Sequence, residues 1–287
     1  MDRRLSILTG QGRRLDGGVV FGSVPHRVWT DWIRPDQDNQ VDLPSRALLV
    51  QQDCQNILVL AGCDMLLAPL PRTCRCQQHT HGLIDGLAQL GLAEGDIHVV
   101  VLTHLHAVLA ADVQVAVRDG DIPRLLFHRA RYLVGKRHWL RALRPHPRDR
   151  GLFVPQVLGQ LEASGRLNLL DGGHCELLGA DWRFHVSDGH TPGQLLPEIH
   201  TSAGPLVFAG DLVPGTPWLQ LDVTSGHDRN PECLVEEKEQ LLDHLVANRG
   251  RLVLARDPWV AMIRVTRDRQ SRYQAYDEHP SLLRLEA

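Results

Sequence analysis

Residues 97–106, with the sequence IHVVVLTHLH, combine a strand pattern with two histidines directly behind it. The run Ile97–Leu102 is short, apolar and rich in valine, which is typical of a β-strand. His104 and His106 follow at positions i and i+2, so their side chains can point to the same side of the chain. Two imidazoles on one side suit two ligands of one metal ion. Many His-x-His pairs are surface or core residues, however, so a site requires further ligands.

Two later strand ends also carry side chains that can bind a metal ion. The strand expected at 182–186 leads into the turn 187–193, SDGHTPG, which contains His190. A third expected strand, Leu206–Phe208, ends in Ala-Gly-Asp with Asp211. Three histidines and one aspartate, each at a strand end, form a ligand set that zinc accepts.

Other segments predict further strands and helices. Apolar residues recur at helical spacing over 81–92, and a second helix is expected between Asn230, a plausible N-cap followed by Pro231, and Gly250. The remaining predicted strands are 46–50, 56–60, 167–170, 251–254 and 262–266. Strands on both flanks of the helices favour an α/β or α+β layered domain.

The composition excludes several classes of protein. The 287 residues are 43% hydrophobic and 23% charged, which argues against a disordered chain or a disulfide scaffold. A net charge of −3 argues against a nucleic-acid partner, and no apolar run reaches the length of a membrane span. Six cysteines and the absence of a signal-peptide core at the start of this sequence lead us to expect a cytoplasmic protein.

In this order and spacing, Thr-His-x-His, Gly-His-Thr-Pro-Gly and a strand ending in Gly-Asp resemble the metallo-β-lactamase superfamily. Residues 17–39 are similar to the opening of a lactonase-like branch, and 210–231 and 251–260 resemble its closing segments. The resemblance implies a four-layer αββα sandwich with the metal site at strand ends between two sheets. It also implies one domain over residues 17–287, preceded by an N-terminal extension over residues 1–16.

The sequence departs from the family pattern around the second metal. Active members read His-x-His-x-Asp-His, whereas Val108 and Leu109 stand here at the last two positions. The closing His-Asp of the family appears as Arg256-Asp257, and its Asp-Thr-Gly turn appears as Leu60-Ala61-Gly62. A tyrosine usual in the family stands here as His227. The resemblance therefore implies a degenerate second metal site.

The first metal site remains complete. The resemblance implies that His104, His106 and His190 hold one zinc or other divalent transition metal ion and leave a fourth position for water. Asp211, which bridges both metals in the family, is also retained.

We expect Arg256 to form an ion pair with Asp211 and to occupy the vacated second site, because a permanently charged guanidinium opposes a second cation there. It could then bind the anionic end of a ligand. The alternative is that Arg256 faces solvent and that the pocket has collapsed around Val108 and Leu109.

These residues favour a mononuclear metal-dependent hydrolase of an ester, lactone or similar bond, with Asp211 and Arg256 as catalytic residues. The alternative is an inactive pseudoenzyme, with or without a metal, that binds a small anionic ligand through Arg256 and His227 or binds a protein partner. We expect the protein to bind a small-molecule ligand or substrate, and we expect no membrane partner. A homodimer and pairing with an active relative both remain open.

A second alternative rests on Cys74, Cys76, His79 and His81, two thiols and two imidazoles within eight residues. They could form a small zinc or redox site in a loop before the helix, although Cys-x-Cys is tighter than the spacing of zinc ribbons. The other interpretation is ordinary cytosolic thiols and surface histidines.

Residues 124–150 carry nine Lys and Arg against one acid, Asp149. One interpretation is a solvated helix whose arginine stems cover apolar surface. The other is a patch that attracts an anionic substrate or partner.

Overall fold

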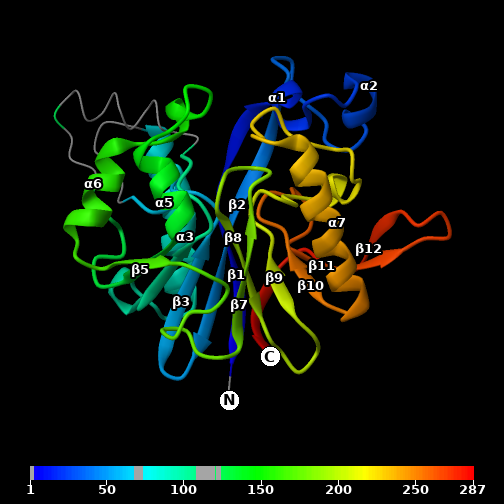
Figure 1. Ribbon diagram of the computed structural model, residues 1–287. Helices are drawn as coiled ribbons and strands as arrows, with labels where there is room; N and C mark the ends of the chain where they lie inside the picture. Colours follow the sequence, from blue (N-terminus) through cyan, green and yellow to red (C-terminus); the bar gives the residue numbers. More distant parts are fainter. Residues whose placement is uncertain (1–2, 68–73, 108–119, 121–123) are drawn as a thin grey trace. The chain divides into compact units, whose positions relative to one another are not determined.

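The computed structural model (Figure 1) describes residues 3–67, 74–107, 120 and 124–287. The chain divides into two compact units. The first unit comprises residues 1–11, 45–172 and 283–286, and the second comprises residues 12–44, 173–282 and 287. Each unit encloses its own cluster of buried apolar side chains, so each has a hydrophobic core.

One sheet has seven strands in the order β13-β1-β2-β3-β4-β5-β6. Its strands are β1 (Arg4–Asp16), β2 (Gln40–Gln52), β3 (Gln55–Leu60), β4 (Val99–Leu102), β5 (Arg131–Gly135), β6 (Leu167–Leu170) and β13 (Leu282–Glu286). Strands β3, β4, β5 and β6 are parallel. Every residue of β4 is buried, as expected for a parallel strand covered on both faces. The carboxyl end of β4 therefore presents its next residues at a fixed place beside β3 and β5.

The helices of the first unit are α3 (Cys74–Gln89), α5 (Lys136–Leu143) and α6 (Pro155–Ala163), with short 3₁₀ turns η1 (Glu94–Asp96) and η2 (Arg150–Leu152). Leu83 and Leu87 of α3 are buried in the core, one helical turn apart. Helix α5 packs against β5, β6 and α6. This packing directs one face of α5 toward the residues that follow β4.

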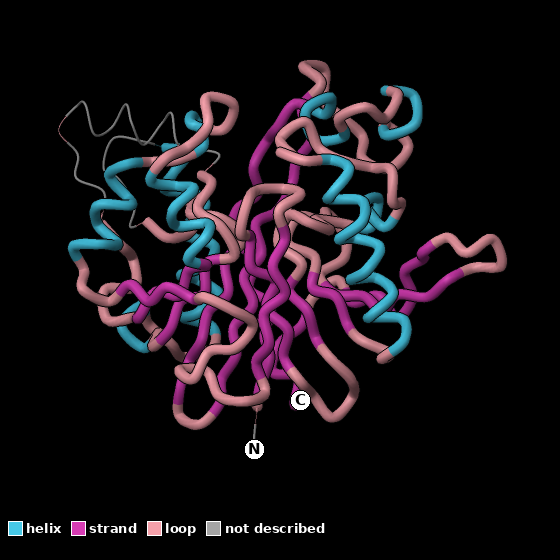
Figure 2. Tube along the Cα trace, in the orientation of Figure 1, coloured by secondary structure: helices cyan, strands magenta, loops and turns pink. Residues whose placement is uncertain are grey.

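The other sheet has six strands in the order β12-β11-β10-β9-β8-β7. They are β7 (Trp182–Ser187), β8 (Gln194–Ile199), β9 (Leu206–Phe208), β10 (Arg251–Val253), β11 (Met262–Arg267) and β12 (Tyr273–His279). Only β9 and β10 run parallel among these pairs. Figure 2 shows the turn between β11 and β12 projecting away from this sheet.

The helices of the second unit are α1 (Gly17–Phe21), α2 (His26–Trp29) and α7 (Pro231–Ala247), with the 3₁₀ turn η3 (Thr216–Leu219). Helix α7 confirms its predicted start, since the Asn230 side chain accepts a hydrogen bond from Cys233 N and Pro231 is the first helical residue. Its predicted apolar stripe is buried in the core, comprising Leu234, Leu241, Leu242 and Leu245. The stripe fixes which side chains α7 turns toward the sheet.

Two predicted segments differ from the structure. Residues 124–150 are not one solvated helix, because 131–135 form the largely buried strand β5 and only 136–143 form helix α5. The Cys-x-Cys segment is not a loop, because α3 begins at Cys74 and includes it. In the first case the basic residues flank a short apolar run that forms β5, and in the second the helix begins before the apolar spacing that starts at residue 81.

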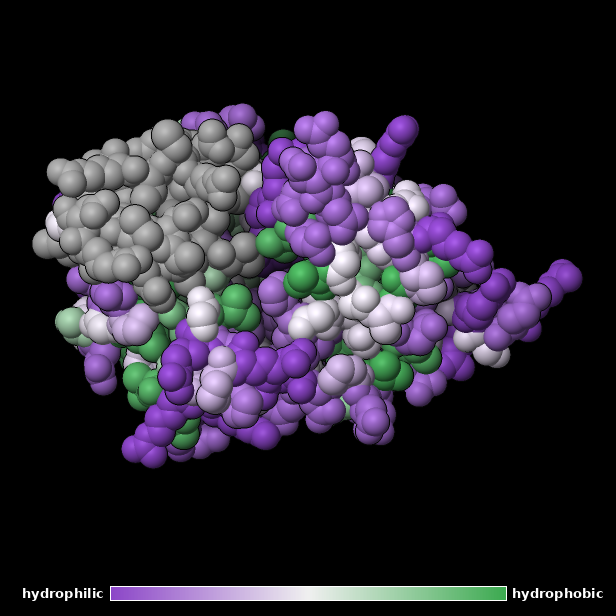
Figure 3. All heavy atoms as spheres, turned by 90° about the horizontal axis from the view of Figure 1, so that it is seen from above, coloured by the Kyte–Doolittle hydropathy of each residue, from purple (hydrophilic) through white to green (hydrophobic). Residues whose placement is uncertain are grey.

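Residues 4–16 of the expected N-terminal extension form β1, a strand between β13 and β2 of the seven-stranded sheet. The single domain expected over 17–287 spans both compact units and stays a prediction. Across the described ranges, no helix has the length and apolar character needed to cross a membrane. On the face drawn in Figure 3, hydrophilic residues predominate among the coloured residues and hydrophobic residues lie between them, which is ordinary for a protein surface.

Candidate metal centre

In the first unit, the residues after β4 place two imidazoles side by side. His104 is 1% exposed and His106 5% exposed, and their ring centroids lie 5.1 Å apart. The hydroxyl of Thr103 lies 2.9 Å from His104 Nδ1. Coordination of a metal by His104 would therefore use Nε2, while Thr103 holds the orientation of the ring.

His138 of α5 completes this histidine group, and sequence reasoning missed it. It is fully buried, and its Nε2 accepts a hydrogen bond of 2.8 Å from Leu105 N, between the two predicted ligands. Phe153 packs against the His106 ring with a centroid distance of 4.9 Å. His138 and Phe153 thus fix the backbone and the ring of the His-x-His segment. No spacing pattern connects either residue to that segment.

Gly62, at the end of the turn after β3, lies against the same segment. Cys63 N donates to the carbonyl of His106 at 2.8 Å. Gly62 has φ +84°, and a Cβ atom there would lie 2.7 Å from that carbonyl oxygen. Glycine is required for this close approach of two backbones. The retained Gly62 therefore supports His106, although Leu60 stands where the family has an aspartate.

In the second unit, His190 lies in the turn between β7 and β8 and is 6% exposed. Its Nδ1 lies 2.8 Å from Oδ1 of Asp228, a buried carboxylate. Burial lowers the pKa of His190, but the hydrogen bond to Asp228 and the charges of Asp211 and Asp228 raise the pKa above its ordinary value. A carboxylate on Nδ1 is the usual outer partner of a metal-binding histidine and directs Nε2 toward the metal.

Helix α7 holds the His190 turn through Glu237. The carboxylate of Glu237 accepts hydrogen bonds from Ser187 Oγ at 2.6 Å, Asp188 N at 2.8 Å and Gly189 N at 3.1 Å. A Cβ atom at Gly189 would lie 2.4 Å from Leu234 of the same helix. The turn therefore rests directly on α7, and glycine at 189 permits that contact.

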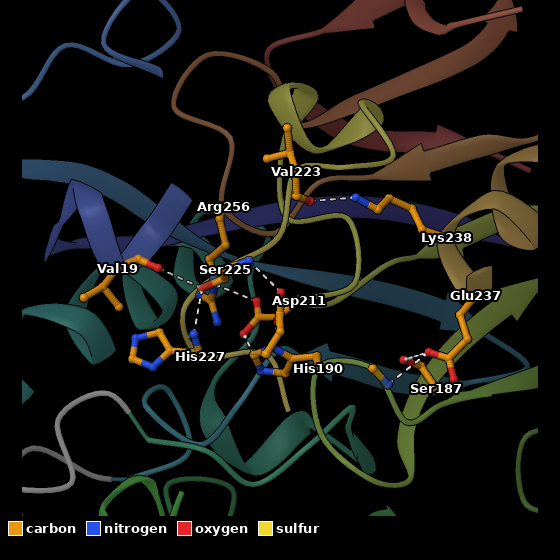
Figure 4. Close-up of polar contacts among 12 residues, drawn as sticks. Val19, Ser187, His190, Asp211, Val223, Ser225, His227, Glu237, Lys238 and Arg256 are labelled. Carbon is orange, nitrogen blue, oxygen red and sulfur yellow. Dashed lines mark hydrogen bonds and ion pairs between the residues drawn. The ribbon is translucent and has the colours of Figure 1, made fainter. Parts of the chain in front are cut away.

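The neighbouring residue of α7 holds the segment that carries Asp228. Lys238 is fully buried, and its Nζ donates to the carbonyls of Gln220 at 3.0 Å and Val223 at 2.7 Å. Burial lowers the pKa of Lys238 to about 8. Asp228 Oδ2 in turn accepts from Ser225 N at 2.6 Å. Figure 4 shows the two side chains extending from one helix, Glu237 toward Ser187 in the His190 turn and Lys238 toward Val223 in the segment that carries Asp228.

The predicted ion pair between Arg256 and Asp211 is confirmed. Arg256 Nε lies 3.1 Å from Asp211 Oδ1, and the other oxygen of Asp211 lies 3.8 Å from His190 Nε2 (Figure 4). Arg256 is 4% exposed, so the alternative in which it faces solvent is wrong. Val108 and Leu109, around which that alternative placed a collapsed pocket, lie outside the described residues.

Asp257 fixes the loop that presents Arg256. Its two carboxylate oxygens accept from Thr216 N and Oγ1, each at 2.7 Å, and from Trp259 N and Val260 N, each at 2.9 Å. Arg256 N also donates to Pro214 O at 2.8 Å. Asp257, which the resemblance matches to the second residue of the family's closing His-Asp, is thus a buried anchor beside Arg256.

Among the other predicted site residues, the structure describes the side chain of His227 but not the side chains of the thiol alternative. His227 is half-buried, and burial followed by the charge of His190 lowers its pKa. Its role in binding a ligand stays a prediction. The four residues of the thiol alternative lie in the first turns of α3, and their side chains are outside the described part of the chain: Cys74, Cys76, His79 and His81.

The donor chemistry fits a transition metal ion. The two strand-end segments supply imidazoles that are almost fully buried, and each described outer contact is made through Nδ1, by Thr103 to His104 and by Asp228 to His190. Imidazoles held in this way are ligands that zinc prefers in catalytic sites.

The family model of the metallo-β-lactamase superfamily matches residues 41–250, more than half of the chain. The chain therefore belongs to the metallo-β-lactamase superfamily. A comparison with curated proteins found no match.

Solved structures show the same fold. A probable metal-dependent hydrolase from Staphylococcus aureus is 21% identical, with a TM-score of 0.78 over 98% of this chain and 99% of that one. The hydrolase AbOPH of the beta lactamase superfamily is 18% identical, with a TM-score of 0.75 over 97% and 95%. AidC, a dizinc quorum-quenching lactonase, is 19% identical, with a TM-score of 0.72 over 96% and 95%. The predicted fold class is confirmed.

Proposed function

We propose that this protein is a mononuclear metal-dependent hydrolase of an ester, lactone or similar bond. His104, His106 and His190 would hold one zinc ion. Bound zinc lowers the pKa of a water molecule to about 7 and polarises a carbonyl group. The family, the buried imidazoles and the outer partner Asp228 of His190 support this assignment.

One observation carries the claim of a single metal. The guanidinium of Arg256 contacts Asp211, the one ligand of the second metal that the sequence retains, through the bond of 3.1 Å. Arg256 is permanently charged and buried. A divalent cation bound to Asp211 would have to lie beside that charge, where like-charge repulsion is poorly screened. Arg256 therefore takes the electrostatic place of the second metal.

Arg256 and Asp211 also have roles toward the substrate. A guanidinium has donors on three nitrogens, so it can hold Asp211 and bind an anionic group at the same time. One carboxylate oxygen of Asp211, Oδ1, accepts from the guanidinium of Arg256 and holds it in place. The other oxygen, Oδ2, faces His190 Nε2. Arg256 would thus offer positive charge to an oxygen of the substrate that becomes negative during hydrolysis.

One structural neighbour with two zinc ions offers a comparison for the proposed single metal. AidC is described as dizinc and as a complex with its product, N-hexanoyl-L-homoserine, which supports the ester and lactone class as a proposal for this chain. Loss of one preorganised electrostatic group typically lowers the rate by about 10²–10³. We expect this protein to be slower than a dizinc relative on a common substrate.

The test compares hydrolysis of a neutral aryl ester and a simple lactone by zinc-loaded protein and by two variants. His104→Ala and His190→Ala each remove one proposed ligand, and both are expected to abolish hydrolysis. His174→Ala is the control, because His174 is an exposed histidine. Hydrolysis that survives either ligand substitution in a folded variant contradicts the proposal.

A pseudoenzyme that binds an anionic ligand is the second candidate, and the buried guanidinium of Arg256 favours it. Its expected result is saturable binding of a carboxylate without hydrolysis of any ester or lactone. Hydrolysis that depends on His104 and His190 excludes it.

A further inference from the structure

A second group of histidines lies in the second unit and includes none of the residues of the candidate metal centre. His185 Nε2 lies 2.7 Å from Glu198 Oε2, and His244 Nε2 lies 2.8 Å from the same oxygen. The two ring centroids are 5.5 Å apart. Two imidazole nitrogens and one carboxylate thus converge, with the ligand atoms all within 4.8 Å of one another.

The register of the sheet and the periodicity of α7 bring these residues together. In the antiparallel pair β7 and β8, His185 faces Leu196, so Glu198 is its diagonal neighbour on the same side of the sheet. Glu237 of α7 contacts Ser187, two residues along β7 on that side. His244 follows Glu237 by seven residues, or about two helical turns, so it projects from the same face of α7. The cluster is therefore built on a sheet and a helix.

The exposure of the three side chains suits a site that exchanges with solvent. The Glu198 side chain is 1% exposed, whereas those of His185 and His244 are 25% and 27% exposed. A buried carboxylate at the base provides fixed negative charge, and the partly exposed imidazoles give an ion a path of entry. Burial raises the pKa of Glu198, but the two histidines outweigh it and hold the pKa below its ordinary value.

The distances are close to those of a metal site. With bonds of about 2.0–2.1 Å, the ligand atoms of a tetrahedral zinc ion are separated by about 3.3 Å. Each Nε2 would have to move by about half an ångström away from Glu198 Oε2, which a small rotation of a partly exposed imidazole provides. The Nε2 protons would move to Nδ1. The Asn248 amide nitrogen lies 3.2 Å from His244 Nδ1 and donates to His244 O at 2.8 Å, so water at the partly exposed ring would accept that proton instead.

We propose that His185, Glu198 and His244 form a separate binding site for a divalent transition metal ion such as zinc. Two imidazoles and one carboxylate select such an ion over calcium or magnesium, which prefer oxygen ligands. Water completes the coordination. The site is independent of His104, His106 and His190, so its existence does not depend on the proposed hydrolase activity.

The test measures the number of zinc ions bound per chain by titration against a chromogenic zinc chelator. His244→Gln keeps a donor for Glu198 but removes an imidazole, and it is expected to bind one zinc fewer than the wild type. His185→Gln is the second variant and is expected to give the same loss. His174→Gln, at an exposed histidine outside the cluster, is expected to match the wild type.

Failure of this site and failure of the candidate metal centre give different results. In His190→Ala protein, the zinc that remains should be lost when His244→Gln is added. An equal zinc count and affinity in wild type, His185→Gln and His244→Gln would overturn the proposal. Should one glutamine variant not fold, the other variant and the Co²⁺ absorption spectrum of His190→Ala protein decide. Four-coordinate Co²⁺ in a built site gives intense visible bands, whereas six-coordinate Co²⁺ on scattered surface groups gives only weak ones.

Discussion

Asp228 is the residue on which the orientation of His190 depends. It is 2% exposed, and its two carboxylate oxygens hold His190 Nδ1 and Ser225 N. Because the imidazole cannot rotate without losing the first contact, its Nε2 keeps one direction. The carboxylate also favours the tautomer in which Nδ1 carries the proton and Nε2 can bind a metal.

We predict that Asp228→Asn lowers zinc affinity at the candidate metal centre by about 10–100-fold, the usual cost of losing an outer carboxylate partner. The measurement is competition against a zinc chelator in His244→Gln protein, which isolates that centre. Asp222→Asn, an exposed acid on the same segment, is the control. An unchanged affinity in folded Asp228→Asn protein would show that Asp228 does not orient a metal ligand.

Arg256 gives a second prediction at this scale. A hydrogen bond to a charged group contributes about 1.5–3 kcal/mol, or roughly 10–100-fold in affinity. Arg256→Gln is therefore expected to weaken binding of carboxylate-bearing ligands by this factor and to change binding of neutral ligands much less. Arg272→Gln, at an exposed arginine, serves as the comparison in calorimetric titrations. Equal losses for charged and neutral ligands would argue against a charge-binding role.

The sequence predicted His104, His106, His190 and Asp211 because each directly follows a strand in a short motif. It could not predict Asp228 or His138, which act on these motifs from 38 and 33 positions away. Contacts between residues so far apart in the sequence depend on the tertiary fold, and no local sequence pattern predicts them. The Arg256–Asp211 pair was predictable only because the family resemblance placed both residues at one site.

At the scale of elements, α7 organises the second unit around His190. Its start, its apolar stripe and its end follow from local rules, which is why the sequence predicted them closely. Its consecutive polar residues Glu237 and Lys238 hold two different segments, and this function has no sequence signature. Strands β1, β8 and β12 were not predicted, because polar residues or a proline interrupt their apolar patterns.

Lys238 predicts a pH dependence of stability. Its pKa of about 8 in the folded protein lies below the value of about 10.4 expected in the unfolded chain. Between these values the unfolded chain binds more protons, so stability rises with pH from about 8 to about 10. The total change is about 3 kcal/mol.

The measurement is urea unfolding of wild type and Lys238→Met at a series of pH values between 7 and about 10. Lys238→Met is expected to lack this increase, and the difference between the two proteins removes the contribution of tyrosines and cysteines that also titrate there. Parallel pH profiles would contradict a buried ammonium group at this position.

At the scale of the whole molecule, two compact units each have a core and each present strand-end histidines. His104 and His106 belong to the first unit and His190 to the second. In the proposed function these three histidines bind one zinc ion. A ligand that binds only the folded state raises the free energy of unfolding, so we expect zinc to stabilise the protein.

We propose that this superfamily member holds one catalytic metal, because Arg256 replaces the second. The most direct measurement is the zinc content per chain of His244→Gln protein after equilibration in a zinc buffer, with and without His190→Ala. We predict one zinc ion per chain, which His190→Ala removes. Two zinc ions that are both lost with His190→Ala, or no zinc at all, would contradict it.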